Sequence, residues 1–118
     1  MNILIVDDSR AMRLIVARTL RQCSVPITSI TEAADGSEAL PIAKAKAFDL
    51  IICDWNMPTM NGLELLRALR EAGVRTRFGF CTSESTPEMR VLGMNAGASF
   101  FVTKPFTAES FDAALAGQ

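Results

Sequence analysis

The chain contains 118 residues, of which 49% are hydrophobic and 21% are charged. This length and composition are typical of one soluble globular domain, and they exclude a disordered chain or two independent cores. Twelve basic and thirteen acidic residues give a formal net charge of -1, which excludes a strong global attraction to nucleic acid or anionic membranes. We therefore predict a single domain over residues 1–118 that binds neither nucleic acid directly nor a membrane.

The N-terminal region and the cysteines indicate a cytoplasmic protein. The apolar run at residues 3–6 is far too short for a signal peptide or a membrane helix, and two aspartates follow it. Cys23, Cys53 and Cys81 lack CxxC spacing, and the chain has no histidine to complete a metal cluster with them. We expect all three to be reduced core cysteines.

Short apolar runs alternate with amphipathic stretches along the chain. The runs predict strands at residues 3–6, 27–30, 50–53, 78–81 and 100–102. The first intervening stretch has helical periodicity, and further helices are predicted over residues 37–46, 62–71, 87–95 and 107–116. Strands separated by helices of this length run parallel with right-handed crossovers, so helices cover both faces of the sheet. The predicted fold class is a three-layer, doubly wound α/β fold with a five-stranded parallel sheet and five helices.

The first helix follows Ser9, which can cap it. One of its faces is mainly apolar, and its basic residues lie mostly elsewhere. The apolar face comprises Met12, Ile15, Val16, Thr19 and Leu20, and the basic residues are Arg10, Arg13, Arg18 and Arg21.

Two later helices contain residues that weaken them. Pro41 falls inside the second helix, where it removes a backbone donor and crowds the preceding turn unless the helix starts later than residue 37, so we expect that helix to be kinked or short. The fourth helix contains Gly93 and Asn95 and ends at Gly97. Its low helix propensity marks it as a mobile element.

Polar side chains follow four of the predicted strands. Asp7 and Asp8 come after the first strand, Asp54 after the third, Thr82 after the fourth and Lys104 after the fifth. Because the carboxyl ends of parallel strands meet at one edge of the sheet, these side chains should converge. Three close carboxylates repel one another unless a hard cation lies among them, and oxygen-only ligands favour Mg²⁺, Ca²⁺ or Mn²⁺. Mg²⁺ fits best, and an opposing lysine indicates phosphoryl transfer to a carboxylate.

Each of these residues also has a simpler explanation. Asp7 and Asp8 could cap the first helix, because acidic residues are favoured at helix starts. Lys104 could be a surface lysine in a turn, and Thr82 a capping or loop hydroxyl. Their joint placement at one end of successive strands favours the functional interpretation.

The motifs that contain these residues resemble the receiver domains of two-component response regulators, in particular chemotaxis-type receivers. The resemblance rests on residues 6–9 (VDDS), 53–58 (CDWNMP), 62–66 (GLELL), 81–83 (CTS) and 104–106 (KPF). It covers essentially the whole chain. It implies a flavodoxin-like strand order of 2-1-3-4-5.

The resemblance also assigns a magnesium-dependent phosphoryl site. By this resemblance Asp54 is the phosphoacceptor, and Asp8 and Asp54 are side-chain ligands of Mg²⁺, with Mn²⁺ as a possible substitute. Asn56 binds the ion through its backbone carbonyl, and Asp7 acts mainly through a bound water.

Further residues are assigned to the switch by the same resemblance. Lys104 binds the phosphoryl group, and the peptide bond between Lys104 and Pro105 is cis. Thr82 moves toward the phosphoryl group. Phe101 is the switch aromatic, although it lacks the hydroxyl of a tyrosine. Asn56 and Glu84 occupy positions that affect the rate of dephosphorylation.

The implied protein is a signalling domain with only intrinsic phosphorylation and dephosphorylation chemistry. Its phosphoryl donor is a histidine kinase, a histidine phosphotransfer domain or a small acyl phosphate. A downstream protein of unknown identity would bind the face formed by the last two helices and the last strand. Candidate residues for that face, most of which we expect to be buried, are Met89, Val91, Met94, Phe106 and Phe111. The sequence leaves open whether the domain stands alone or was cut from a longer protein.

Three other functions fit the sequence less well. A haloacid dehalogenase expects the pattern DxDx[TV], but Trp55 and Asn56 follow Asp54, which leaves no second aspartate. A flavodoxin-like cofactor site would need a loop rich in glycine and hydroxyl groups after the first strand, where Asp7 and Asp8 would repel a phosphate. A degenerate receiver used only as a scaffold is disfavoured because every chemical position is filled.

Overall fold

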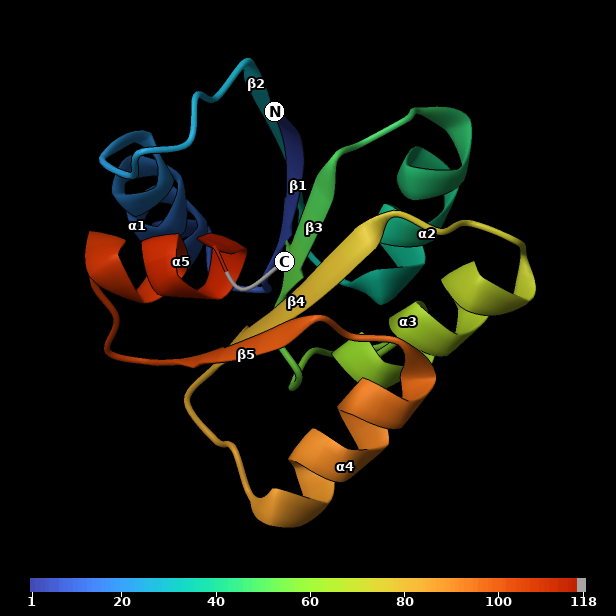
Figure 1. Ribbon diagram of the computed structural model, residues 1–118. Coiled ribbons are helices and arrows are strands. Elements are labelled where there is room, and N and C mark those ends of the chain that lie inside the picture. The colour runs from blue at the N-terminus through green and yellow to red at the C-terminus, as the bar shows by residue number, and fades with distance from the viewer. Residues whose placement is uncertain (117–118) are drawn as a thin grey trace.

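Five strands and five helices alternate along residues 1–116, the part of the chain that this computed structural model describes (Figure 1). The strands are β1 (Asn2–Val6), β2 (Ser29–Ala33), β3 (Leu50–Cys53), β4 (Arg77–Thr82) and β5 (Phe100–Thr103). The helices are α1 (Arg10–Arg21), α2 (Gly36–Ala45), α3 (Gly62–Glu71), α4 (Pro87–Ala96) and α5 (Ala108–Ala116). The predicted α/β class, with its alternation of strands and helices, is confirmed.

The strands form one parallel sheet in the order β2-β1-β3-β4-β5, as the resemblance implied. The direction of winding reverses between β1 and β3. In the register of the sheet, Val6 pairs with Ala33 of β2 on one side and with Cys53 of β3 on the other. The residues that follow Val6 and Cys53 therefore leave the sheet side by side, at the point where doubly wound folds bind their ligands.

Helices cover both faces of the sheet, with α1 and α5 on one face and α2, α3 and α4 on the other (Figure 1). All four side chains of β3 are buried and alternate between the two apolar clusters. A strand covered on both faces needs no polar positions, which explains its uninterrupted apolar run. Within residues 1–116, no helix combines the length and the hydrophobicity needed to cross a membrane.

Side-chain caps fix where the helices begin. Ser9 accepts a hydrogen bond from the N–H of Met12, as predicted, and Thr86 caps α4 in the same way. Asn61 and Glu64 form a reciprocal capping box at the start of α3. Because Ser9 directly follows the Asp7-Asp8 pair, the cap of α1 also fixes the distance between that helix and the acidic strand end.

The second strand begins later than predicted. It spans Ser29–Ala33 instead of residues 27–30. The carbonyl of Met1 accepts the N–H of Thr28 at 2.8 Å, and ladder pairing with β1 starts only at Ser29, opposite Asn2. The prediction was wrong because Ile27 packs against the cluster under α1 and α5 from a loop, whereas β2 is an edge strand with only Ala33 fully buried.

The buried stripe of α1 is narrower than its apolar face. Val16 and Leu20 are buried, but Ile15 is 47% exposed and its neighbour Leu14 is 52% exposed. Successive helical residues are rotated by about 100°, so Ile15 lies beyond the contact that Val16 makes with the sheet.

The cysteines are free, and two of the three lie in the core as predicted. Burial raises the pKa of the Cys53 thiol well above its ordinary value and that of Cys81 to about 12. Both thiols are therefore protonated and unreactive at neutral pH. Cys23 is only half-buried, where its sulfur contacts the carbonyls of Thr19 and Ala108.

Pro41 lies inside α2, which continues through it to Ala45. The expectation of a short helix is therefore wrong. Asp35 caps the helix, and the side chain of Pro41 is exposed, so its ring meets solvent on one side. The missing N–H still leaves the carbonyl of Ser37 without its usual helical donor.

We predict that Pro41→Ala raises the free energy of unfolding by about 1–2 kcal/mol, because alanine restores the donor and removes the ring from the preceding turn. The gain is reduced by the larger conformational freedom of alanine in the unfolded chain. Urea unfolding followed by circular dichroism would measure it, with Lys44→Ala on the same helix as a control. Equal stability of wild type and Pro41→Ala would contradict the prediction.

Candidate functional site

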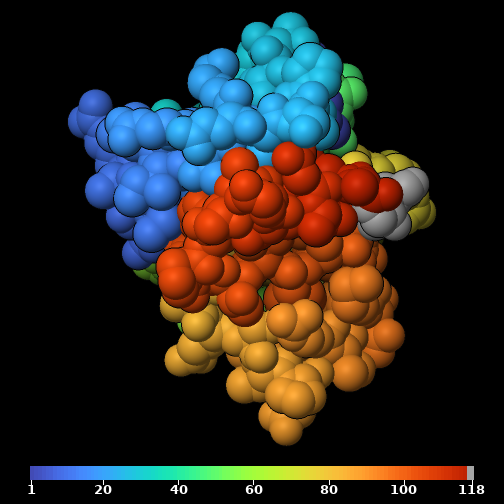
Figure 2. Space-filling model, turned by 60° about the vertical axis from the view of Figure 1, so that its left-hand side comes forward, coloured from blue at the N-terminus to red at the C-terminus, as the bar shows by residue number. Residues whose placement is uncertain are grey.

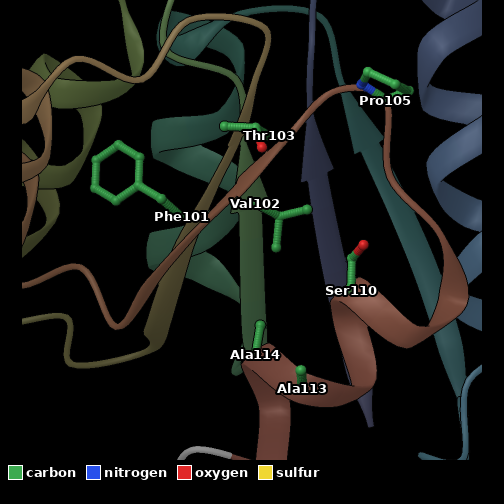
Figure 3. Close-up of a pocket in the computed structure, with 7 residues that line it drawn as sticks. All are labelled: Phe101, Val102, Thr103, Pro105, Ser110, Ala113 and Ala114. Atoms are coloured by element: carbon green, nitrogen blue, oxygen red, sulfur yellow. The ribbon is translucent and has the colours of Figure 1, made fainter.

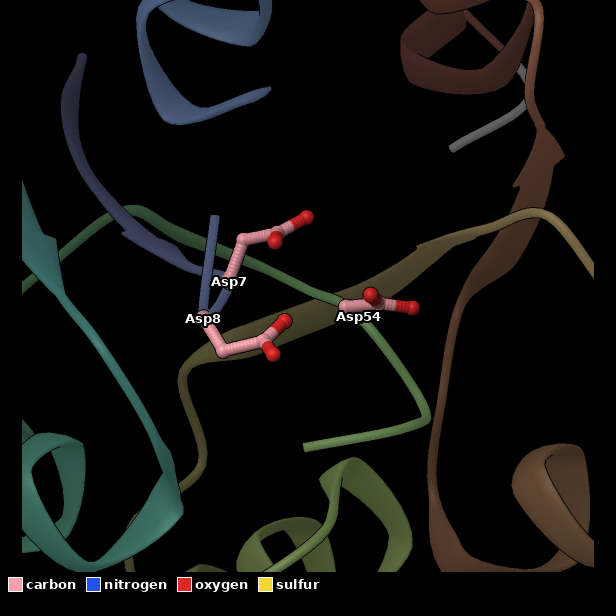
Figure 4. A group of neighbouring side chains, drawn as sticks. All are labelled: Asp7, Asp8 and Asp54. Atoms are coloured by element: carbon pink, nitrogen blue, oxygen red, sulfur yellow. The ribbon is translucent and has the colours of Figure 1, made fainter. Parts of the chain in front are cut away.

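Side chains from four strand ends meet at the carboxyl edge of the sheet. Asp7 follows β1, Asp54 follows β3, Thr82 ends β4 and Lys104 follows β5. Carboxylate oxygens of Asp7, Asp8 and Asp54 lie within 4.8 Å of one another, and Figure 4 shows the first two side chains extending toward Asp54. The convergence predicted from the sequence is therefore observed.

Lys104 provides the positive charge of this cluster. Its Nζ donates to Asp7 Oδ2 at 3.0 Å and lies 3.4 Å from Asp54 Oδ2. The Lys104-Pro105 peptide bond is cis, as the resemblance implied, and the N–H of Lys104 donates to the carbonyl of Thr82 at 2.9 Å. One ammonium group faces three carboxylates, so the cluster keeps an excess of negative charge when all three are ionised.

The pKa values of Asp54 and Lys104 reflect this balance. Burial raises the pKa of Asp54, and the charge of Asp7 raises it further, although Lys104 partly offsets both effects. Burial alone would lower the pKa of Lys104, but its hydrogen bond to Asp7 and the charge of Asp54 raise it overall. Lys104 therefore stays protonated at neutral pH, and its positive charge only partly balances the negative charge of an ionised Asp54.

The two N-terminal aspartates differ in how firmly they are held. Asp7 is only 3% exposed, and its carboxylate accepts the N–H of Ser9 at 2.9 Å as well as the ammonium of Lys104. Asp8 is exposed, and its carboxylate makes no hydrogen bond or ion pair with any of residues 1–116. Asp8 can therefore offer its oxygens to a ligand without breaking an existing bond.

A tight loop holds Asp54. Its N–H donates to the carbonyl of Val6 at 2.9 Å, and its Oδ1 accepts the N–H of Trp55 at 2.7 Å. The loop closes at the start of α3, where the N–H of Gly62 donates to the carbonyl of Trp55. A Cβ on Gly62 would lie 2.3 Å from the carbonyl oxygen of Asp54, so only glycine allows α3 to begin this close to Asp54.

Asn56 lies in the same loop with an exposed side chain. Its backbone carbonyl accepts no hydrogen bond from the described residues, which leaves it available as a ligand. Thr59 adopts a φ of 68°, a left-handed conformation that is uncommon for a β-branched residue. The loop is thus held in one shape against a local backbone preference.

Thr82, the last residue of β4, and Glu84, in the loop that follows, occupy different environments. Thr82 is completely buried, and its hydroxyl oxygen makes no well-formed hydrogen bond with the described residues, although its approach to Asp54 helps to lower the pKa of that carboxyl against the effect of burial. An unpaired buried hydroxyl is costly, so this group favours any acceptor that comes within its reach. Glu84 is exposed in the loop that leads to α4.

Phe101 packs beneath α4, and its ring connects through Phe80 to Trp55, in the loop that holds Asp54. Its ring stacks on Phe80 with centroids 4.8 Å apart, and Phe80 lies 4.9 Å from Trp55, the residue after Asp54. A Cβ on Gly93 would lie 2.6 Å from Phe101 Cζ, so the glycine leaves room for the ring. Arg90 covers the ring at 5.5 Å. By contrast, Phe100 is only 8% exposed and packs in the opposite cluster.

The expectation that most apolar candidates of the last two helices are buried is wrong. Phe111 is buried, and Met89 and Phe106 are half-buried, but Val91 is 58% exposed and Met94 is 48% exposed. Among the residues of α4 only Gly93 is fully buried. The helix rests on the sheet through this small residue, so its larger side chains point to solvent.

A shallow hollow lies between β5 and α5. In Figure 3 the side chains of Phe101 and Val102 project to opposite sides of β5. In Figure 2, α5 lies between the α1 region and the α4 segment on the exposed face. The hollow is lined by Phe101, Val102, Thr103, Pro105, Ser110, Ala113 and Ala114.

The acidic cluster has the chemistry of a site for a hard divalent cation. Its donors are the carboxylate oxygens of Asp7, Asp8 and Asp54, without a thiolate or imidazole among them. Mg²⁺ prefers such oxygen ligands and retains several waters, which suits a site open on the side of Asp8. The residual negative charge of the cluster favours the same ion.

Comparison with known proteins identifies the family. The model of the response regulator receiver domain matches residues 3–116. The chain belongs to the response regulator receiver family. It is 40% identical over 111 residues to the chemotaxis protein CheY of Pseudomonas aeruginosa, covering 92% of this chain and 88% of that protein. It is 41% identical over 110 residues to CheY-3 of Vibrio cholerae, covering 92% and 83%.

Solved structures agree with this family. The chain superposes on chemotaxis protein CheY4 of Vibrio cholerae with a TM-score of 0.82 at 35% identity, covering 98% of this chain and 96% of that one. The receiver domain of the putative response regulator NarL from Mycobacterium tuberculosis gives a TM-score of 0.88 at 28% identity, with coverage of 98% and 93%. The flavodoxin-like receiver fold and a role in two-component signalling follow, and the receiver family implies a histidine kinase as phosphoryl donor and a downstream target.

Sequence reasoning missed two contacts at this receiver site. Arg13 of α1 donates to the backbone carbonyl of Asp7, and the ring of Trp55 packs at a tilt against Phe80, on which Phe101 stacks. The periodicity of α1 placed Arg13 off the apolar face, but it did not show that its side chain turns back toward the strand end.

In the absence of divalent cations, we predict that Asp54→Asn stabilises the receiver domain by an amount that grows with pH. The pKa of Asp54 is raised above its ordinary value of 3.8, so the folded state binds this proton more tightly than the unfolded state does. Ionisation therefore costs folding free energy as the pH rises through the range above 3.8, and asparagine avoids this cost. Urea unfolding in EDTA between about pH 4 and about pH 7 would test it. A stability difference that narrows with pH would contradict the prediction.

Proposed function

We propose that this receiver domain is a phosphorylation-activated switch in which Asp54 accepts a phosphoryl group in a Mg²⁺-dependent reaction. The observation that carries the proposal is the cluster of Asp7, Asp8 and Asp54 beside the ammonium of Lys104. Phosphoryl transfer needs an oxygen nucleophile, in-line access and positive charge around the equatorial oxygens. The cluster combines the nucleophile with one fixed positive charge and the ligands for a second.

The proposed ligands of Mg²⁺ are the side chains of Asp8 and Asp54 and the backbone carbonyl of Asn56, with Asp7 acting mainly through water. The accessible carboxylate of Asp8 and the free carbonyl of Asn56 support this assignment. Asp7 is already bound to Ser9 and Lys104, which supports an indirect role. When bound, the ion supplies charge neutralisation, and Mn²⁺ could replace it because it accepts the same ligands.

In the proposed reaction, a carboxylate oxygen of Asp54 attacks the phosphorus of a phosphohistidine. A new P–O bond forms while the P–N bond breaks, and the histidine nitrogen leaves. Lys104 lies 3.4 Å from Asp54 Oδ2, where it can bind an oxygen of the transferred group. Hydrolysis returns the domain to its resting state when water attacks the same phosphorus, the P–O bond to Asp54 breaks, and inorganic phosphate leaves. The protein is thus a signalling phosphoacceptor with intrinsic chemistry, not an enzyme acting on a separate substrate.

The proposed response begins at Thr82 and Phe101. The buried hydroxyl of Thr82 makes no well-formed hydrogen bond with the described residues, and a phosphoryl oxygen on Asp54 would supply an acceptor. Movement of Thr82 changes the space beside Phe101, whose ring supports α4 at Gly93. The exposed side chains of α4, together with β5 and α5, are the proposed binding face for the downstream target.

The proposed unit is a single receiver domain that acts in the cytoplasm. Its phosphoryl donor is a histidine kinase or a histidine phosphotransfer domain, and small acyl phosphates can replace it in vitro. The formal net charge of -1 supports protein partners over nucleic acid or membranes.

We predict that acetyl phosphate adds one phosphoryl group to the wild-type protein only when Mg²⁺ is present, and adds none to Asp54→Asn. Intact-protein mass spectrometry at mildly acidic pH would measure the labile adduct. Asp49→Asn is the matched control, because Asp49 lies at the opposite end of β3 and should leave labelling unchanged. Full labelling of Asp54→Asn would reject Asp54 as the acceptor, and no labelling of folded wild type would favour a scaffold role.

We also predict that Glu84→Ala and side-chain substitutions at Asn56 change the lifetime of the phosphorylated state without removing the acceptor. Both side chains are exposed, Asn56 two residues after Asp54 and Glu84 two residues after Thr82, and from these positions they can affect the approach of water to phosphorus. The decay of the mass adduct after removal of acetyl phosphate would give the lifetime. Lifetimes equal to that of wild type in both variants would contradict the assignment.

A further inference from the structure

Arg13 connects α1 to the acidic strand end. Its Nη1 donates to the backbone carbonyl oxygen of Asp7 at 2.5 Å, and its Nε donates to Glu32 Oε1 of β2 at 2.8 Å. The Arg13 side chain is only 13% exposed, whereas that of Glu32 is 40% exposed. The guanidinium thus makes two hydrogen bonds, one to the carboxylate of Glu32 on β2 and the other to the backbone carbonyl of Asp7 in the site.

The bond to Asp7 fixes the peptide that carries Asp8. The carbonyl of Asp7 and the N–H of Asp8 belong to the same planar peptide unit, so holding that oxygen also sets the position of the Asp8 Cα. On its other side, the N–H of Asp7 donates to the carbonyl of Ala33 at 3.1 Å. No described residue bonds the carboxylate of Asp8, so its place in the site depends on this backbone.

We propose that Arg13 is a positioning residue for the divalent cation, acting through the Asp7-Asp8 peptide. The inference rests on the proposed function of the acidic cluster. Groups that orient metal ligands without touching the ion commonly affect affinity by tenfold or more. Arg13 has this relation to Asp8, and the bond to Glu32 holds the guanidinium in the required orientation.

The charge of Arg13 makes the inference sharply testable. A positive charge near the acidic cluster repels a cation, so electrostatics alone predicts that removing Arg13 tightens Mg²⁺ binding. A positioning role predicts the opposite sign, because Asp8 loses its fixed place. The two effects can therefore be separated by the direction of the change in affinity.

The experiment is a Mg²⁺ titration of the full chain, followed by the fluorescence of Trp55, the only tryptophan, which lies next to Asp54. We expect the dissociation constant of Arg13→Ala to rise about tenfold relative to wild type. Arg13→Lys keeps the charge but has a single ammonium in place of the guanidinium, and should also bind more weakly. Circular dichroism would show that each variant is folded.

Two matched variants complete the test. Arg18→Ala removes an exposed arginine from the same helix and should leave the affinity unchanged. Glu32→Gln keeps an oxygen acceptor for Arg13 Nε and should stay close to wild type. Glu32→Ala removes that acceptor and should weaken Mg²⁺ binding, so this variant still tests the proposal if Arg13→Ala does not fold. Unchanged or tighter binding by folded Arg13→Ala would overturn the positioning role. A wild type that binds no Mg²⁺ would instead contradict the proposed function itself.

Discussion

The mutual repulsion of three carboxylates at one sheet edge is the constraint on which the site depends. Asp7, Asp8 and Asp54 lie within 4.8 Å of one another, and Lys104 supplies a single opposing charge. Such a cluster does not stabilise the fold by itself, since burial and Asp7 raise the pKa of Asp54. The rest of the domain must hold these groups together, and it does so through buried strands on both sides. The excess negative charge is also what makes the site receptive to a cation.

The register of the parallel sheet positions the aspartates that follow β1 and β3. Val6 and Cys53 pair across β1 and β3, so the following aspartates leave the sheet together without any direct bond between their side chains. The N–H of Asp54 then donates to the carbonyl of Val6, which extends the ladder into the site. Two side chains add hydrogen bonds to this backbone arrangement. Lys104 binds the carboxylates, and Arg13 binds the backbone carbonyl of Asp7. Rigid strands therefore set the approximate positions, and side-chain bonds set the final directions.

Sequence reasoning succeeded where strand ends determine position. The fold class and the convergence of Asp7, Asp54 and Lys104 followed from the alternation of apolar runs, because parallel strands end at a common edge. It failed where neighbours across space decide the outcome. The edge strand β2 was misplaced because its apolar signal came from Ile27 in the preceding loop, and the exposure of α4 was missed because periodicity defines a face without showing what covers it.

The weak attachment of α4 gives the proposed switch its physical basis. The helix has one fully buried residue, Gly93, and beneath it lies the half-buried ring of Phe101. An element held by few buried contacts can change its arrangement at a cost of a few kcal/mol, which is the range that a change of local charge can supply. The core strands, buried on both faces, cannot move at that cost. In the proposed switch, a phosphoryl group on Asp54 would act through Thr82 and Phe101 on this helix, whose one fully buried residue is Gly93, while the sheet that positions the carboxylates stays unchanged.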